Sequence, residues 1–126
     1  ISIFLSVFNV HVNRSTYDAQ TTQVLYKEGR HINAMSPESS KVNESNAIWL
    51  NAAEGPMTVR QVSGAVARRI VCLPTPGETL SRGQKIGMIK FGSRTELFLP
   101  PGTEVTVKLK DKVKGGASIV ARFAKD

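Results

Sequence analysis

The sequence predicts a mainly β fold: a flattened barrel or sandwich of short strands, built from quasi-repeated halves, with one or two short helices. Three observations lead to this prediction. Apolar and polar residues alternate in short runs, turn residues such as glycine, proline and asparagine separate most of these runs, and one pattern of residues occurs twice. A chain of 126 residues can bury one modest core, so we expect a single domain over residues 1–126.

The positions of these turn residues give the expected strands and helices. In the first strand, period-2 alternation places even-numbered positions from Phe4 onward on one face and odd-numbered positions up to His11 on the other. Short helices are expected over residues 63–69, which contain a run of small and apolar residues, and over residues 37–44. In chain order, strands are expected over residues 2–12, 21–27, 46–51, 57–62, 69–73, 85–91, 95–99, 104–109 and 118–123.

An internal repeat sharpens the predicted architecture. Residues 77–86 align with residues 110–119, 33 positions later, and each copy reads acidic, aliphatic, glycine and then a strand. The pair resembles the paired loops of lipoyl and biotinyl domains, whose two quasi-symmetric halves form a flattened barrel. The chemistry would then lie between the copies, on a turn held by a rigid β scaffold.

The charge balance indicates an anionic partner. Seventeen lysines and arginines against ten acidic residues give a net charge of +7, which favours either a lipid surface or nucleic acid. The chain has one Trp, two Tyr and five Phe, and no stripe of alternating basic and aromatic residues of the kind that stacks bases. We therefore expect an anionic membrane surface and no nucleic acid.

No membrane-spanning helix is predicted. The longest apolar stretch, residues 1–12, is interrupted by polar residues and is shorter than the roughly 20 residues that span a bilayer. It also lacks the charged start and small-residue cleavage site of a signal peptide. Because the chain begins with Ile1 in an apolar strand pattern and not with methionine, we expect a missing upstream segment, which could carry a membrane anchor.

Neither a disulfide nor a metal site is predicted. Cys72 is the single cysteine, and the only two histidines do not form a cluster of metal ligands at a recognised spacing. Cys72 lies in an apolar run and is expected to be a small buried hydrophobe. This cysteine usage favours a reducing, cytoplasmic setting.

The candidate reactive feature is a Gly-Ser bond. Residues 87–91 read as a strand, which stops at Gly92-Ser93 between the basic residues Lys90 and Arg94. The hydroxyl of Ser93 could attack the carbonyl just before it, because glycine lets the backbone adopt strained conformations. The alternative is an ordinary hairpin turn, since Gly-Ser pairs are common in turns.

Four segments, in order, resemble the short branch of the phosphatidylserine decarboxylase family, which includes the archaetidylserine decarboxylases. They are residues 3–14 (Ile-Phe-Leu-Ser-Val-Phe-Asn-Val-His-Val-Asn-Arg), residues 43–47 (Asn-Glu-Ser-Asn-Ala), residues 61–72 and residues 87–94, the last supplying the cleavage site. The resemblance covers nearly the whole chain.

The resemblance implies a covalent cofactor made from the chain itself. Attack by Ser93 would break the bond after Gly92, leaving a β chain that ends at Gly92 and an α chain that begins with a pyruvoyl group derived from Ser93. That group is an electron sink for decarboxylating a serine phospholipid to the ethanolamine phospholipid. The implied place is the cytoplasmic face of the cell membrane, peripheral or anchored through the upstream segment. Diacyl and archaeal ether lipids both remain open.

The resemblance also suggests roles for charged residues. His11 is the candidate for proton transfer, with a half-buried structural histidine as the alternative. Arg68, Lys90 and Arg94 are candidates for binding the phosphate or carboxylate of the substrate, with solvated hairpin charges as the alternative for the last two. His31 is expected to be solvated and not catalytic.

Two other functions remain open at this point. One is a biotinyl-like or lipoyl-like carrier modified on Lys90, which stands between apolar neighbours on a hairpin. The other is an unprocessed homologue that only binds acidic lipids.

Overall fold

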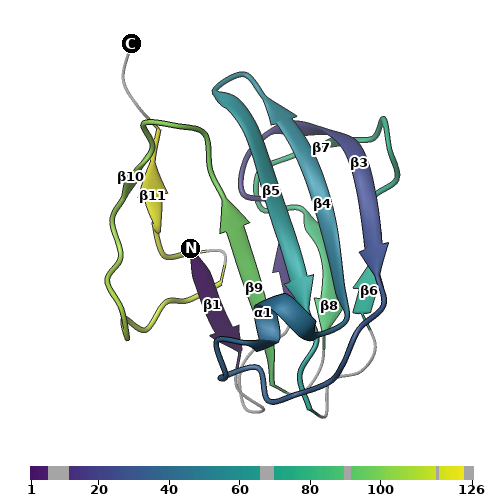
Figure 1. Ribbon diagram of the computed structural model, residues 1–126. Helices are drawn as coiled ribbons and strands as arrows, with labels where there is room; N and C mark the ends of the chain where they lie inside the picture. The colour runs from purple at the N-terminus through teal and green to yellow at the C-terminus, as the bar shows by residue number, and fades with distance from the viewer. Residues whose placement is uncertain (6–11, 66–69, 90–91, 116, 124–126) are drawn as a thin grey trace.

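The computed structural model describes residues 1–5, 12–65, 70–89, 92–115 and 117–123, and it is mainly β (Figure 1). A six-stranded antiparallel sheet, in the order β1-β9-β5-β4-β3-β7, forms the body of the protein. Its strands are β1 (Ser2–Leu5), β9 (Ser93–Phe98), β5 (Gly55–Val62), β4 (Ser45–Ala52), β3 (Ala19–Lys27) and β7 (Thr79–Leu80).

Two smaller antiparallel sheets accompany this body. The three-stranded sheet has the order β2-β8-β6, and the two-stranded sheet pairs β10 with β11. The short helix α1 (Ser39–Val42) lies over one end of the outer face of the large sheet (Figure 1). The strands of the small sheets are β2 (Val12–Arg14), β8 (Lys85–Ile89), β6 (Ile70–Cys72), β10 (Glu104–Val105) and β11 (Ala121–Arg122).

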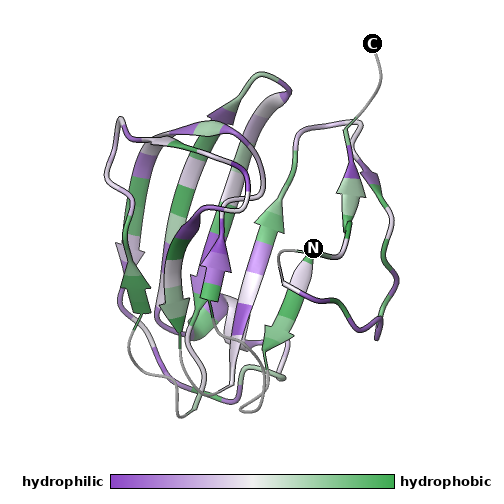
Figure 2. Ribbon diagram, turned by 180° about the vertical axis from the view of Figure 1, so that it is seen from behind, coloured by the Kyte–Doolittle hydropathy of each residue, from purple (hydrophilic) through white to green (hydrophobic). Residues whose placement is uncertain are grey.

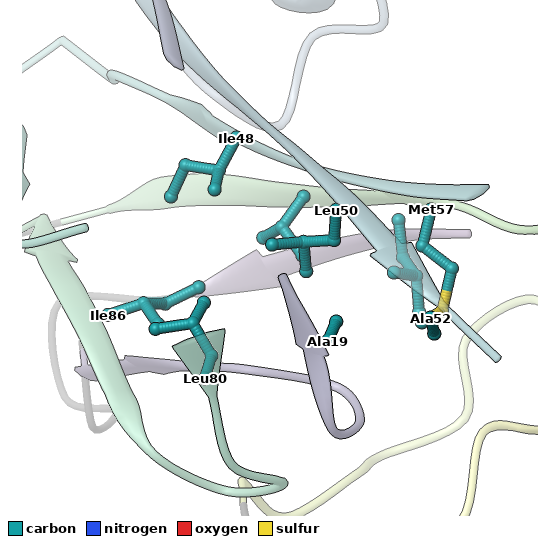
Figure 3. Packing of buried hydrophobic residues seen from close by; sticks show 9 residues of the cluster. Ala19, Ile48, Leu50, Ala52, Met57, Leu80 and Ile86 are labelled. Atoms are coloured by element: carbon teal, nitrogen blue, oxygen red, sulfur yellow. The ribbon is translucent and has the colours of Figure 1, made fainter. Parts of the chain in front are cut away.

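The core lies between the large sheet and the elements that fold back over it. Along β4 the side chains alternate, so that Ile48 and Leu50 are buried while Trp49 between them is exposed. Leu80 of β7 and Ile86 of β8 pack against them from other elements (Figure 3). The alternation of apolar and polar residues along the strands is visible in Figure 2. One buried face and one exposed face explain why period-2 patterns dominate the sequence.

The predicted mainly β class is confirmed, and the strands expected from 21–27 to 95–99 are found with small shifts of their ends. Of the first strand expected over 2–12, residues 2–5 form β1 and Val12 begins β2 of another sheet, while residues 6–11 lie outside the described residues. The last two expected strands shorten to β10 and β11, and β7 was not predicted because two residues carry no periodicity.

The two predicted helices differ in outcome. The helix expected over 37–44 is found as α1. In the range 63–69, residues 63–65 are not helical and residues 66–69 lie outside the described residues. The described ranges hold no helix long and apolar enough to cross a membrane.

The internal repeat is present as a pair of turns. At the start of the first copy, Glu78 bonds back to Thr75, two positions before the copy: the Thr75 N–H donates to the Glu78 carboxylate (3.1 Å) and the Glu78 N–H donates to the Thr75 carbonyl (3.1 Å). At the start of the second copy, Asp111 forms the same two bonds with Lys108, at 2.8 and 3.2 Å. The first copy leads into β8 of the three-stranded sheet and the second into the two-residue β11. The turns therefore repeat, but the strands after them do not.

Candidate functional site

Ser93 is the first residue of β9, the strand that lies between β1 and β5 in the large sheet. It stands opposite Leu5 in the β1–β9 ladder, so strand β9 begins at the serine itself. Ser93 is fully buried, and its hydroxyl has no hydrogen-bond partner among the described residues. A buried, unpaired hydroxyl costs free energy, which suggests that it has a chemical use.

Gly64 approaches the backbone carbonyl of Gly92. Gly92 has a φ of 73°, in the left-handed region that favours glycine, although a Cβ built on it would touch no atom within 4 Å. The limit at Gly64 is space: a Cβ there would lie 1.8 Å from the carbonyl oxygen of Gly92. The two positions therefore require glycine for different reasons, one conformational and one steric.

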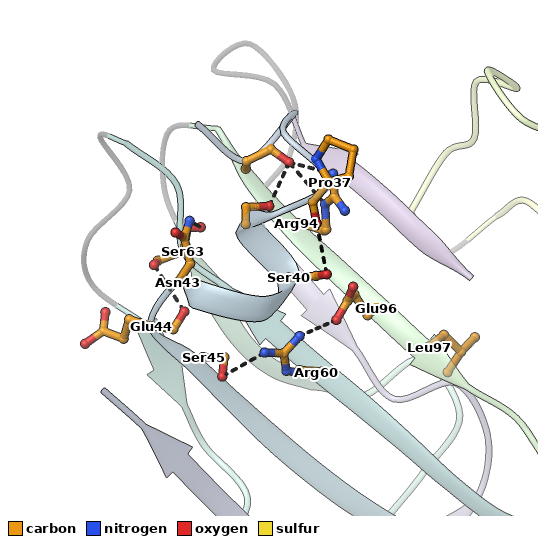
Figure 4. A network of polar contacts seen from close by, with 12 residues as sticks. Pro37, Ser40, Asn43, Glu44, Ser45, Arg60, Ser63, Arg94, Glu96 and Leu97 are labelled. Carbon is orange, nitrogen blue, oxygen red and sulfur yellow. Dashed lines mark hydrogen bonds and ion pairs between the residues drawn. The ribbon is translucent and has the colours of Figure 1, made fainter. Parts of the chain in front are cut away.

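Hydrogen bonds fix the backbone that approaches this carbonyl. The hydroxyl and the N–H of Ser63 both donate to the carbonyl of Glu44, at 3.1 and 3.0 Å. The side-chain amide of Asn43 donates to the carbonyls of Ser63 (2.7 Å) and Ile32 (2.8 Å) and accepts from the N–H of Ile32. Because Asn43 and Ser63 are buried, this segment forms a firm support beside Gly92 (Figure 4).

Arg94 binds backbone carbonyls next to the Gly-Ser bond. Its Nε and Nη2 donate to the carbonyl of Ala34, at 3.1 and 2.7 Å, and Nη2 also reaches the Met35 carbonyl at 3.4 Å. The guanidinium thus ties the loop before α1 to the start of β9 (Figure 4). Its expected contact with a substrate phosphate stays a prediction, since these bonds occupy only part of its donor set.

An ion pair crosses from β5 to β9 on the outer face. Arg60 Nη1 lies 2.5 Å from Glu96 Oε1, and Nη2 of the same arginine donates to the Ser45 hydroxyl at 3.3 Å (Figure 4). The two side chains are only 19% and 12% exposed. The pair therefore sits in a partly desolvated place, where it is stronger than a surface salt bridge.

Glu44 organises a second group of polar side chains. The phenol of Tyr26 donates to one of its carboxylate oxygens, and His31 Nε2 lies 3.5 Å from the other. The hydrogen bond to Glu44, followed by smaller effects of desolvation and nearby negative charge, raises the pKa of Tyr26 to about 12. His31 lies in a loop, as expected, but its side chain is only 28% exposed and stands beside this carboxylate.

The other three predicted site residues, His11, Arg68 and Lys90, lie outside the described residues.

Cys72, which was expected to be a small buried hydrophobe, is half-buried. Burial raises the pKa of its thiol, and a hydrogen bond from Asn46 opposes this effect. Within the described ranges, no group of three or more His, Cys, Asp or Glu side chains could hold a metal ion.

Sequence reasoning did not identify Gly64, Asn43 or Ser63 as part of the site. All three lie in segments already noted for the family resemblance, but a glycine or an asparagine in a loop carries no chemical signal of its own. Only the folded chain shows that Gly64 touches Gly92 from a position 28 residues away.

Comparison with known proteins points to one family. The family model described as phosphatidylserine decarboxylase matches residues 1–121. Proteins named phosphatidylserine decarboxylase proenzyme from Nitrosomonas eutropha, Syntrophus aciditrophicus and Neisseria meningitidis serogroup B are 46%, 43% and 44% identical to the chain over 124, 125 and 124 residues. These alignments cover 98% of this chain and 57%, 58% and 47% of the respective relatives.

The chain thus spans about half the length of the curated relatives that it matches. No solved structure matches it. The family model nevertheless covers both Gly64 and the Gly92-Ser93 bond, and the identity extends over nearly the whole chain. On this basis the chain belongs to the phosphatidylserine decarboxylase family.

Proposed function

We propose that this protein decarboxylates a serine phospholipid to the ethanolamine phospholipid, using a pyruvoyl group that it makes from Ser93 by self-cleavage. The observation that carries the proposal is the state of Ser93: it is buried, its hydroxyl lacks a partner among the described residues, and it follows a glycine with a φ of 73°. Family membership favours this function over a biotinyl-like carrier.

The cleavage step follows the chemistry of the family. Ser93 Oγ attacks the carbonyl carbon of Gly92, an ester C–O bond replaces the peptide C–N bond, and the hydroxyl proton ends on the Ser93 nitrogen. Loss of the Cα proton of Ser93 then breaks the Cβ–O bond and releases Gly92 as a carboxylate. Water replaces nitrogen in the remaining dehydroalanine, releasing ammonia and leaving the pyruvoyl group.

The surroundings of Ser93 fit both the cleavage and its product. Burial keeps bulk water from hydrolysing the ester before elimination. The new group would stand at the first residue of a strand held on both sides, which suits a reactive centre that needs a fixed position. When formed, the group supplies an electron sink for the pair left by departing carbon dioxide.

We propose that the protein meets its lipid substrate at the cytoplasmic face of the cell membrane. The net charge of +7 supports contact with anionic lipid. Trp49 on β4 and Phe98 on β9 both pair with Thr58 of β5, so the three residues form one cross-strand row on the outer face of the sheet. Trp49 and Phe98 are exposed there. Sedimentation with vesicles should show binding that rises with the phosphatidylserine fraction and falls with salt.

An intact mass spectrum of the purified, denatured full-length protein tests the cleavage directly. Two fragments that meet between Gly92 and Ser93 are expected, the C-terminal one bearing a ketone that borohydride reduces. The Ser93→Ala variant should stay uncut, because alanine has no hydroxyl. Decarboxylation of a serine phospholipid by the cleaved wild type, and none by the variant, completes the test, with diacyl and ether lipids compared as substrates.

Two other outcomes of the mass spectrum would support the alternative functions. A single unmodified chain would support the homologue that only binds acidic lipids. An uncut chain with an added mass on Lys90 would support the carrier.

A further inference from the structure

Three buried amide side chains form a row between the large sheet and the three-stranded sheet. Asn46 Nδ2 donates to Gln61 Oε1 (3.0 Å), Gln61 Nε2 donates to Asn13 Oδ1 (2.8 Å), and Asn13 Nδ2 donates to Thr95 Oγ1 (3.0 Å). Gln61 Nε2 also donates to the carbonyl of Val71 on β6 (3.1 Å). Asn13, Asn46 and Gln61 are 5%, 3% and 0% exposed.

This row is fixed by the register of the strands. Asn46, Gln61 and Thr95 are cross-strand neighbours on β4, β5 and β9. Asn13 belongs to β2 of the other sheet and closes the row from the opposite side. Two sheets that pack only through aliphatic side chains can slide by small amounts, whereas a chain of directional hydrogen bonds allows one relative position.

Gly87 of β8 leaves room for the side-chain amide of Gln61. A Cβ on Gly87 of β8 would lie 2.4 Å from Gln61 Nε2 and 2.3 Å from the carbonyl of Val71. The backbone of β8 therefore presses directly on the amide, and a glycine is needed there. The amide is held from both sheets and cannot rotate away without breaking the row.

The row ends next to the proposed reaction. Thr95 is two residues after Ser93 on β9, so both side chains point to the same, interior face of the sheet. Asn13 is two residues after His11 in the chain. The hydrogen bond between Asn13 and Thr95 thus joins the strand that begins at the nucleophile to the strand that follows the candidate proton carrier.

We propose that Asn13, Gln61 and Asn46 are positioning residues for self-cleavage, which set Ser93 Oγ against the carbonyl carbon of Gly92 through the bond to Thr95. This inference rests on the proposed self-cleavage. It adds a role for residues that never touch the reacting atoms. Misplacement of a nucleophile by about 1 Å can slow a reaction by about 100-fold, so loss of the row has a measurable kinetic effect.

The experiment measures the rate of cleavage of freshly made full-length protein by intact mass, and the urea midpoint of the same substitution in the uncleavable Ser93→Ala background. Thr95→Val removes the acceptor at nearly constant volume, and about 10- to 100-fold slower cleavage is expected. Thr95→Ser keeps the hydroxyl and should restore a rate near that of the wild type. Leu97→Ala, a core truncation on the same strand, is the control for lost stability.

A double variant separates positioning from stability. Asn13→Leu with Thr95→Val removes both partners of the bond and also the acceptor of Gln61 Nε2, so its urea midpoint should match that of Asn13→Leu and not fall by the sum of the two single losses. Slow cleavage in both single variants and in the double variant supports the proposal. Cleavage near the wild-type rate in the double variant, or a slowing in Leu97→Ala equal to that of Thr95→Val at equal stability, would overturn it.

Failure of the proposed self-cleavage can be told apart from failure of this inference. A wild-type protein that is never cleaved removes the proposed self-cleavage and with it this inference, whereas a cleaved wild type with Thr95→Val cleaved at the same rate removes the inference alone.

Discussion

The backbone of Gly64 lies against the carbonyl oxygen of Gly92, so closely that a β carbon on Gly64 would stand 1.8 Å from that oxygen. Real β carbons never approach an oxygen so closely, and the oxygen is a backbone atom that a side-chain rotation cannot move aside. Gly64 is itself held by the hydrogen bonds of Ser63 and Asn43. Whatever happens at the Gly92 carbonyl is therefore coupled to a loop nearly thirty positions earlier in the chain.

Gly64→Ala should block or strongly slow cleavage after Gly92. The added methyl must push the carbonyl of Gly92 away, and a displacement of about 1 Å can cost about 100-fold in rate. The measurement is the fraction of uncut chain against time by intact mass.

The matched control is Gly115→Ala, where a β carbon meets no atom within 4 Å. This variant should be cleaved as the wild type is. Equal cleavage of both variants would mean that the contact between Gly64 and Gly92 has no part in the reaction.

Cleavage after Gly92 should not separate the two products in native buffer. The C-terminal fragment would begin with β9, which is an inner strand of the large sheet with ladders to both β1 and β5. In addition, the main-chain nitrogen of Ile1 donates to the carbonyl of Leu97 at 2.8 Å. Both fragments should therefore elute together in size-exclusion chromatography and separate only in denaturant. Release of the C-terminal fragment without denaturant would contradict the sheet order.

The ion pair between Arg60 and Glu96 should stabilise the protein more than a surface pair does. Glu96→Gln leaves a partly buried guanidinium without its counter-charge, and the expected loss is about 1–3 kcal/mol in the free energy of unfolding. Urea unfolding in the uncleavable Ser93→Ala background measures it, because a single chain allows a two-state analysis.

The double variant Arg60→Met with Glu96→Leu should recover part of this loss, since two apolar side chains leave no unpaired charge. A double-mutant cycle gives the coupling energy of the pair. A coupling near zero would place this pair among ordinary surface salt bridges.

The sequence was informative where a pattern has a physical period. Alternation predicted β4 and β5, because each has one mostly buried and one more exposed face, and the repeat predicted the turns at Glu78 and Asp111. The Gly92-Ser93 bond was identified from the chemistry that a hydroxyl beside a glycine permits. Family resemblance then supplied the reaction.

Contacts between distant strands could not be predicted in the same way. Nothing in the sequence says that Gln61 meets Asn13 across two sheets, because amides have no periodic signature and are usually exposed. Arg94 shows the same limit: the sequence places a basic residue beside the Gly-Ser bond, but it does not give the bonds that the guanidinium makes to the carbonyls of Ala34 and Met35. Side-chain partners are set by the fold.

Tyr26 should titrate with a pKa of about 12, against an ordinary value of 10, because its phenol donates to the carboxylate of Glu44. The folded protein then holds this proton more tightly than the unfolded chain does. The stabilising contribution is complete below pH 10 and is lost as the pH rises from 10 to 12. Tyrosinate absorbance in a Tyr17→Phe background, which leaves Tyr26 as the single tyrosine, follows this titration.

Glu44→Gln should bring the pKa of Tyr26 back toward its ordinary value, since both the hydrogen bond to a carboxylate and its negative charge are removed. Glu28→Gln is the matched control, because Glu28 is the smallest of the causes that raise this pKa and makes no bond to the phenol. If the two variants shift the titration equally, general negative charge and not the hydrogen bond holds the proton. A larger shift in Glu44→Gln would confirm that the hydrogen bond to the Glu44 carboxylate is the main cause of the raised pKa of Tyr26.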